Sequence, residues 1–133
     1  MNDKKFQTLM RMAKSLQQFD NDRDEYWRSF QRGLRRLHHG EKFGTTEEHE
    51  KWLNCREGEY RMHMQTGYRA GFYYDDMKIE APADVQPLRK LLGLTVADLA
   101  EIAAVSPRTI EGWEQGRNIA PASLELIRKY LMI

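Results

Sequence analysis

The sequence predicts an all-α protein, and three observations lead to this prediction. Apolar residues recur at spacings of three and four along most of the 133-residue chain, which is the period of an amphipathic helix. Capping and turn residues divide these runs into short helices. No stretch shows the apolar and polar alternation of a convincing half-buried strand.

The composition is typical of a globular protein of the cytoplasm. Hydrophobic residues make up 41% and charged residues 31% of the chain. No apolar run approaches the roughly 20 residues of a membrane span, and the first ten residues lack the apolar core of a secretion signal. Cys55 is the only cysteine, so an internal disulfide is impossible and a reducing compartment is expected.

Two amphipathic helices are expected before residue 40. The first, over residues 4–16, has an apolar side made of Phe6, Leu9, Met10, Ala13 and Leu16. The second begins near Asp22 or Asp24, either of which can cap it. Its apolar side is made of Tyr26, Trp27, Phe30, Leu34 and Leu37. The spacing predicts that these two sides face a common core.

Two further helices are expected before residue 77. The sequence "TTEE" at 45–48 matches the capping box, in which a threonine is followed three residues later by glutamate. Residues 60–74 form the fourth helix. Gly67 and Gly71, one turn apart on its face, allow close approach of a neighbour, and Gly33 is a candidate for the matching notch. Close packing within one core is favoured, and a dimer contact through the same notch is the alternative.

The chain is expected to contain two domains. Residues 1–76 form a helical domain for dimerisation or partner binding, and residues 77–84, with mixed charge and a proline, form a linker. Residues 85–133 form the second domain, in which four short helices are expected. Thr95 and Ser106 cap its second and third helices, and Gly116 provides the left-handed stop of the third. Ser123 or Ala122 begins the fourth.

The stretch "LRKLLGLTVADLAEIAAVSPRTIEGWEQGRNIAP" resembles the Cro/phage-repressor (XRE-type) helix-turn-helix family. It has the L-G-L-[ST] start, the D/E-L-A pair, the V-S turn and the W-E-x-G end of that family. The resemblance runs from about Val85 to Tyr130. It implies a repressor-like helix-turn-helix bundle that binds double-stranded DNA, with the helix from Pro107 to Gln115 as the recognition helix.

The resemblance also implies roles for individual residues. Arg108 is the candidate for direct readout, because its guanidinium matches the two acceptors of guanine. The other residues implied to face bases are Pro107, Thr109, Glu111 and Gly112. The residues implied to contact phosphates are Thr95, Ser106, Arg117 and Asn118. Residues 84–133 carry six basic and six acidic side chains, which leaves the affinity for DNA open.

Gly112 is unexpected inside a helix, where glycine costs about 1 kcal/mol relative to alanine. It lies one turn after Arg108 on the same face. One interpretation is close approach of the backbone to DNA at a site read by few side chains. The other is a tolerated, mildly destabilising surface glycine.

The N-terminal part contains three further candidate sites. Arg28, Arg32, Arg35 and Arg36 fall at helical spacings and form one basic stripe, which either contacts phosphates or an acidic partner, or is a solvated face paired with Asp22, Asp24 and Glu25. Four histidines and Cys55 lack the paired spacing of a zinc site, so no metal is expected. His38 beside Glu41 is the only candidate acid–base pair, so no enzyme activity and no cofactor are expected.

The sequence therefore predicts a sequence-specific transcriptional regulator, with repression the expected direction, that binds a palindromic operator as a homodimer. The first alternative is an antitoxin that grips a toxin through residues 1–80 and regulates its own gene through the helix-turn-helix. The second alternative is an enzyme that acts on nucleic acid and is docked there by its C-terminal module. In that alternative the enzymatic activity depends on His38.

Overall fold

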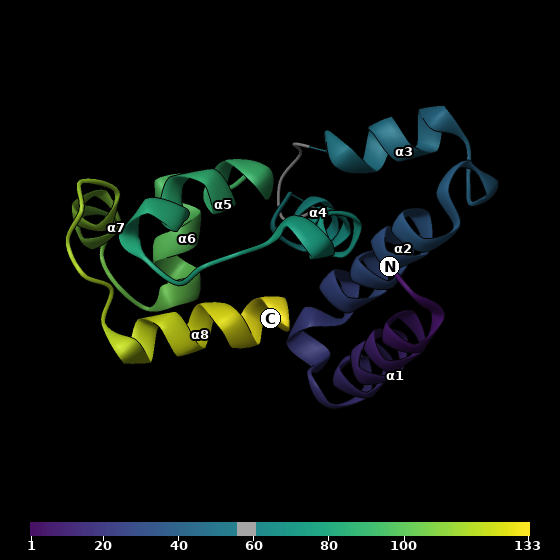
Figure 1. The fold of residues 1–133 in the computed structure, drawn as a ribbon, viewed down its shortest axis with the longest axis horizontal. Coiled ribbons are helices and arrows are strands. Elements are labelled where there is room, and N and C mark those ends of the chain that lie inside the picture. The colour runs from purple at the N-terminus through teal and green to yellow at the C-terminus, as the bar shows by residue number, and fades with distance from the viewer. Residues whose placement is uncertain (56–60) are drawn as a thin grey trace. The chain divides into compact units, whose positions relative to one another are not determined.

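The computed structural model describes residues 1–55 and 61–133 and divides the chain into two compact units, Met1–Asp75 and Asp76–Ile133 (Figure 1). The regular elements of the described residues are helices and helical turns, with no strand among them. This confirms the all-α prediction. Within the same residues, no helix combines the length and the apolar character that crossing a bilayer requires.

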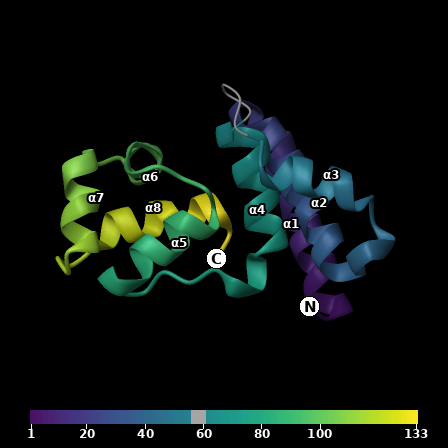
Figure 2. The ribbon, with the colours of Figure 1, turned by 90° about the horizontal axis from the view of Figure 1, so that it is seen from above.

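The first unit is organised around one central helix. Its α-helices within the described residues are α1 (Asp3–Phe19), α2 (Asp24–His39), α3 (Thr46–Leu53) and α4 (Thr66–Phe72). α2 packs against both α1 and α4, as Figures 1 and 2 show from two directions. The predicted apolar side of α2 forms the core, because Tyr26, Trp27, Phe30 and Leu34 are each at most 1% exposed.

The predicted start of α3 is confirmed, whereas the starts of α2 and α4 differ from the prediction. The Thr45 hydroxyl accepts a hydrogen bond from the backbone N–H of Glu48 and caps α3, as predicted. The predicted cap of α2 is wrong: the capping position is held by Arg23, whose side chain makes no capping bond. The predicted fourth helix is an α-helix only over Thr66–Phe72, preceded by a π-helical turn over Arg61–Gln65. Tyr60, its predicted first residue, lies outside the described residues.

Three glycines allow the backbones of α2 and α4 to touch. A Cβ atom added to Gly71 would overlap the carbonyl oxygen of Phe30 and lie 2.8 Å from the backbone nitrogen of Leu34. Gly33 and Gly67 face the opposite helix in the same way. The matching notch is therefore filled by the chain's own helices, as the favoured interpretation expected. The alternative of a dimer contact through this notch is wrong.

The second unit is a bundle of four short helices. They are α5 (Val85–Leu91), α6 (Val96–Ala103), α7 (Pro107–Glu114) and α8 (Pro121–Leu131). α8 begins at Pro121, earlier than predicted. The core of the second unit contains one buried aromatic side chain, Trp113. The buried aliphatic residues of this core are Val85, Leu88, Leu92, Leu94, Leu99, Ile110, Ile127 and Leu131.

The segment 77–84, for which the sequence predicts a linker, lies in the second unit. Met77 and Ile79 bury their side chains, and Arg128 donates from Nη2 to the carbonyl of Ile79 at 2.9 Å. The Asp84 carboxylate accepts hydrogen bonds from the backbone N–H groups of Glu80 and Ala81. These bonds hold the pKa of Asp84 below its usual value, because they favour the charged form.

Candidate nucleic-acid interface

Short-range capping fixes both helices of the turn between α6 and α7. The Thr95 hydroxyl accepts from the N–H of Asp98, and the Asp98 carboxylate accepts from the N–H of Thr95, so a full capping box starts α6. Ser106 caps α7 by accepting from the N–H of Thr109. Pro107 follows at the first helical position, where a backbone donor is not needed. The predicted caps of both helices are thus confirmed.

The turn itself is tight because the chain reverses at one residue. Ala104 adopts a left-handed conformation, with φ 56°, and the N–H of Val105 donates back to the carbonyl of Ala100 at 3.0 Å. Ala100 and Ala103 are buried, so small side chains occupy this end of α6 and let α7 pack close. The two helices are therefore held at a fixed mutual orientation.

α7 has one buried and one exposed side. Ile110 and Trp113 are at most 3% exposed and anchor the helix in the core of the second unit. Pro107, Arg108 and Glu111 are exposed. The structure describes no acidic partner for the Arg108 guanidinium within residues 1–55 and 61–133. Arg108 is thus an exposed, unneutralised fork of hydrogen-bond donors on a rigid helix.

Some of the hydroxyl groups that the sequence predicts to contact DNA near the start of α7 already form hydrogen bonds within the protein. The Oγ of Ser106 and the Oγ1 of Thr109 lie 3.0 Å apart and share a hydrogen bond. Thr109 is half-buried, whereas Thr95 and Ser106 are exposed. Each hydroxyl offers one donor and two acceptor positions, so the Thr95 cap still leaves its hydroxyl hydrogen for an external acceptor.

Gly112 is covered by a side chain of its own unit, so the interpretation as a surface glycine is wrong. Gly112 is buried, and a Cβ atom added there would lie 3.0 Å from Cδ of Arg117. The end of α7 creates this contact. The N–H of Arg117 donates to the carbonyl of Gly112, and the N–H of Gly116 donates to that of Trp113, which is a Schellman motif.

The missing side chain at position 112 therefore makes room for the aliphatic stem of Arg117. Arg117 and Asn118 are exposed, and Arg117 has no ion pair among the residues that the structure describes. The guanidinium of Arg117 thus lies close to the face of α7 that carries Arg108. The sequence alone does not predict this arrangement, because a glycine at position 112 does not reveal which side chain covers it.

A part-buried ion pair that the sequence did not indicate ties α5 to α7. Nε of Arg89 lies 2.8 Å from Oε1 of Glu114, and Nη1 of Arg89 donates to the carbonyl of Leu94. Both side chains of the pair are 15% exposed. Arg89 and Glu114 therefore neutralise each other inside the unit.

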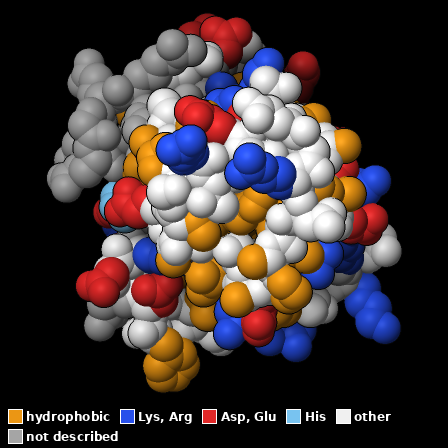
Figure 3. Space-filling model, turned by 90° about the vertical axis from the view of Figure 1, so that its left-hand side faces the viewer, with side chains coloured by type: hydrophobic (Ala, Val, Ile, Leu, Met, Phe, Trp, Pro, Cys, Tyr) orange, Lys and Arg blue, Asp and Glu red, His pale blue; other side chains and the backbone are white. Residues whose placement is uncertain are grey.

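The surface on the α7 side of the second unit carries side chains of several kinds. Figure 3, which faces the α7 side of Figure 1, shows basic, acidic and apolar side chains intermixed there.

The predicted basic stripe of α2 is wrong as a single surface. Arg28 pairs with Asp24 and Glu25, as expected for a solvated face. Arg32 lies over the ring of Trp52 instead. Arg36 is 8% exposed and donates to the carbonyls of Phe43 and Gly44.

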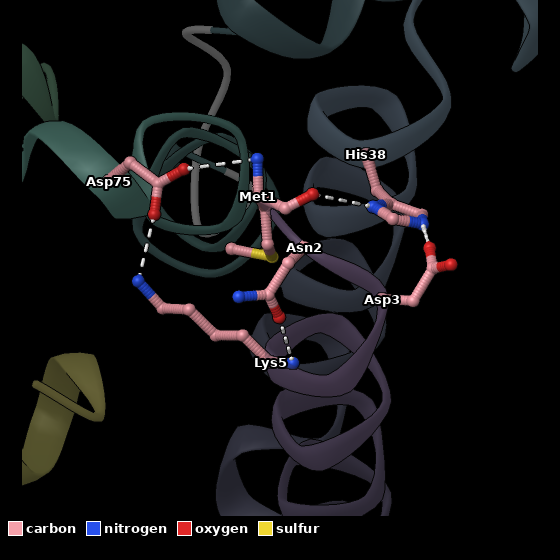
Figure 4. Close-up of polar contacts among 6 residues, drawn as sticks. All are labelled: Met1, Asn2, Asp3, Lys5, His38 and Asp75. Atoms are coloured by element: carbon pink, nitrogen blue, oxygen red, sulfur yellow. Dashed lines mark hydrogen bonds and ion pairs between the residues drawn. The ribbon is translucent and has the colours of Figure 1, made fainter.

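His38 participates in a contact network around the chain's first residues (Figure 4). Its Nε2 lies 2.8 Å from Oδ1 of Asp3, and its Nδ1 lies 3.3 Å from the carbonyl oxygen of Met1. The ring also stacks on Phe6 at 4.2 Å. The predicted partner, Glu41, makes neither of these contacts. Both ring nitrogens therefore serve to hold α1 against α2.

No group of three or more His, Cys, Asp or Glu side chains is placed to hold a metal ion within the described part of the chain. Cys55 is a free thiol.

Residues 88–131, from within α5 to the end of α8, match the model of the family described as Helix-turn-helix. The match covers about a third of the chain and confirms the helix-turn-helix that the sequence predicted in this region. The family comprises DNA-binding regulators of the XRE type and is not an enzyme family. Neither the curated proteins nor the solved structures give a match to the chain.

Proposed function

We propose that the protein is a sequence-specific transcriptional regulator of the cytoplasm, a repressor that reads the major groove with α7. The helix-turn-helix match supports DNA binding by the second unit. The observation that carries the proposal is the exposed Arg108 at the start of a helix anchored by Ile110 and Trp113. A rigid scaffold is required because base readout depends on the angle at which a side chain enters the groove.

In this proposal the residues around α7 divide into base-reading and phosphate-binding groups. Arg108 donates two hydrogen bonds to one guanine, while Pro107, Thr109 and Glu111 face the neighbouring bases. Glu111 accepts from a cytosine amino group, and Thr109 contacts a thymine methyl group. The phosphate-binding residues are Thr95, Ser106, Arg117 and Asn118. Gly112 contributes by leaving room for Arg117.

The protein binds DNA as a homodimer in this proposal. One recognition helix reaches only a few base pairs, and two half-sites about one helical turn apart supply the remaining affinity. The net charge of zero over residues 84–133 supports this requirement, since a neutral module gains little from non-specific attraction to phosphates. The first unit sets the dimer geometry or binds a partner.

Selection of bound sequences from a random duplex library tests the proposal directly. We expect an inverted repeat whose half-sites each contain a fixed guanine and whose centres lie about 10 base pairs apart. The protein for the control selection carries Arg108→Ala, which keeps every phosphate contact. Enrichment of no common sequence by the unaltered protein would exclude specific recognition.

Gly112→Ala tests whether position 112 positions Arg117. We expect the free energy of unfolding to rise by about 0.5–1 kcal/mol, since alanine is the better helix former, while operator affinity falls about tenfold because the new methyl group displaces Arg117. Thermal unfolding and fluorescence anisotropy with the selected operator measure the two effects. In an Arg117→Ala background the same change should cost no further affinity. Equal losses in both backgrounds would contradict the proposed role of Arg117.

The antitoxin remains the second candidate function, and one observation favours it. α1 carries two apolar side chains seven residues apart, Met12 and Phe19, which are 47% and 85% exposed. Residues at this spacing lie on one face of a helix, and exposed apolar surface is typical of a partner interface. A small toxin encoded beside this gene that binds the full chain, and releases it on Phe19→Asp, would favour this function.

A further inference from the structure

The first unit contains a cavity beside its hydrophobic core. The cavity has a volume of about 440 Å³ and lies between α2, α3, α4 and the loop before α3. Small-molecule sites in proteins occupy a few hundred to about 1,000 Å³, so the size suits a compact ligand. Every described residue that lines the cavity belongs to the first unit.

Aromatic rings form the apolar walls of this cavity. The rings of Trp52 and Tyr68 are nearly parallel, with an interplanar angle of 23° and centroids 6.4 Å apart. Phe43 contributes a third ring. Aromatic walls of this kind favour a ligand with a planar apolar body, because such a body stacks offset or edge-on against the rings.

The charged side chains at the cavity are mostly basic. The Arg32 guanidinium lies 4.9 Å from the centroid of the Trp52 ring, and Lys51 also lines the cavity. Within the described residues, neither Arg32 nor Lys51 forms an ion pair. Glu48 is the only acidic side chain that lines the cavity within the same residues.

A buried arginine next to the cavity adds to its positive potential. Arg36 donates from Nη1 to the backbone carbonyls of Phe43 and Gly44, which are neutral acceptors. No carboxylate pairs with Arg36 in the described part of the chain. A cation that is removed from water and paired only with carbonyls retains its long-range field.

A hydrogen-bonded polar pair, His49 and Tyr68, also lines the cavity. Nδ1 of His49 lies 2.7 Å from the hydroxyl of Tyr68. Burial lowers the pKa of His49, and the charge of Arg36 lowers it further. Burial raises the pKa of Tyr68 to about 12. Among the charged side chains at the cavity, the three cations Arg32, Lys51 and Arg36 thus outnumber Glu48, the one carboxylate that lines it within the described residues.

We propose that this cavity binds a small organic acid with a planar apolar body. Its carboxylate lies at Arg32 and Lys51. Its ring packs against Trp52 and Phe43, two lining rings that are partly exposed, because Tyr68 is only 3% exposed. An arginine that is partly removed from water and lacks an acidic partner gains a charge-assisted, bidentate contact when the acid binds. The proposal does not depend on DNA binding by the second unit.

Calorimetric titration of the full chain with matched probes tests the proposal. Indole-3-acetate and benzoate carry both required features, whereas indole-3-acetamide and benzamide lack the charge and propionate lacks the ring. We expect the aromatic acids to bind with dissociation constants of about 1 mM or lower. The amides and propionate should bind at least about tenfold more weakly, because each lacks one of the two contacts.

Arg32→Gln should weaken binding of the aromatic acids at least about tenfold, the effect of removing one charge-assisted hydrogen bond. The matched control is Arg28→Gln, one turn earlier on α2, because Arg28 already pairs with Asp24 and Glu25 and does not line the cavity. It should leave affinity unchanged, and both variants should melt at the temperature of the unaltered protein. Equal binding of acids and amides, an unchanged affinity in Arg32→Gln, or no heat at about 10 mM acid would each overturn the proposal.

Discussion

Arg108→Ala is expected to abolish operator-specific binding without changing thermal unfolding. Arg108 is exposed and has no ion pair within the described residues, so its removal leaves the packing of α7 intact. A bidentate contact to guanine is worth about 1–3 kcal/mol of discrimination. A dimer loses that contact in both half-sites, which multiplies the effect on affinity. Anisotropy titrations with the selected operator and with a scrambled duplex measure the change.

Arg108→Lys separates base readout from charge. Lysine keeps the positive charge but lacks the planar fork that makes two parallel hydrogen bonds. We therefore expect this variant to bind the scrambled duplex like the unaltered protein and to lose preference at one base pair per half-site. Lys90→Ala, on α5, removes an exposed basic residue outside the proposed interface and serves as the control. An unchanged preference in both Arg108 variants would show that another residue reads that position.

Gly71→Ala is expected to destabilise the first unit by at least about 3 kcal/mol, at or beyond the upper end of typical overpacking costs. The added Cβ atom would overlap the carbonyl of Phe30 and crowd the backbone nitrogen of Leu34. Both obstacles are backbone atoms of α2, so relief requires that the two helices separate. Separation would open the packing around Tyr26 and Phe30, which are fully buried.

Chemical denaturation followed by circular dichroism and tryptophan fluorescence measures this effect. Gly112→Ala is the matched control, because the same methyl group there meets only the movable side chain of Arg117. The change Trp113→Phe removes the buried tryptophan of the second unit. In that background the fluorescence of Trp27, the buried tryptophan of the first unit, reports the unfolding of the first unit. An unfolding free energy within about 0.5 kcal/mol of the parent value would show that α2 and α4 are not in backbone contact.

The start and stop signals of the helices were the most predictable features. The sequence predicts caps at Thr45, Thr95 and Ser106, and each of them accepts a hydrogen bond from the N–H three residues later. Such a bond depends only on the residue and its close neighbours. The failed cap of α2 has a different cause, since a short 3-10 turn over Asn21–Arg23 precedes the helix and moves Asp24 to its first position.

The partners of long side chains were the least predictable features. Four arginines at helical spacing suggested one stripe, yet Arg28 is paired in solvent, Arg32 lies on Trp52 and Arg36 is buried. The sequence suggests Glu41 as the partner of His38, whereas His38 contacts Asp3 and the backbone of Met1. Only Arg28 has its partners, Asp24 and Glu25, on α2. The partners of Arg32, Arg36 and His38 lie outside α2, so helical spacing within α2 carries no information about them.

The sequence by itself determined the helical class, the caps of α3, α6 and α7, and the helix-turn-helix of the second unit. These features follow from apolar periodicity and from hydrogen bonds that span three or four residues. Only the tertiary structure decided that Gly33, Gly67 and Gly71 join α2 to α4, that Gly112 lies under Arg117, and that cationic and aromatic residues surround one cavity. Those outcomes depend on which elements pack together, and packing is settled by the shape and volume of the whole core rather than by any single segment.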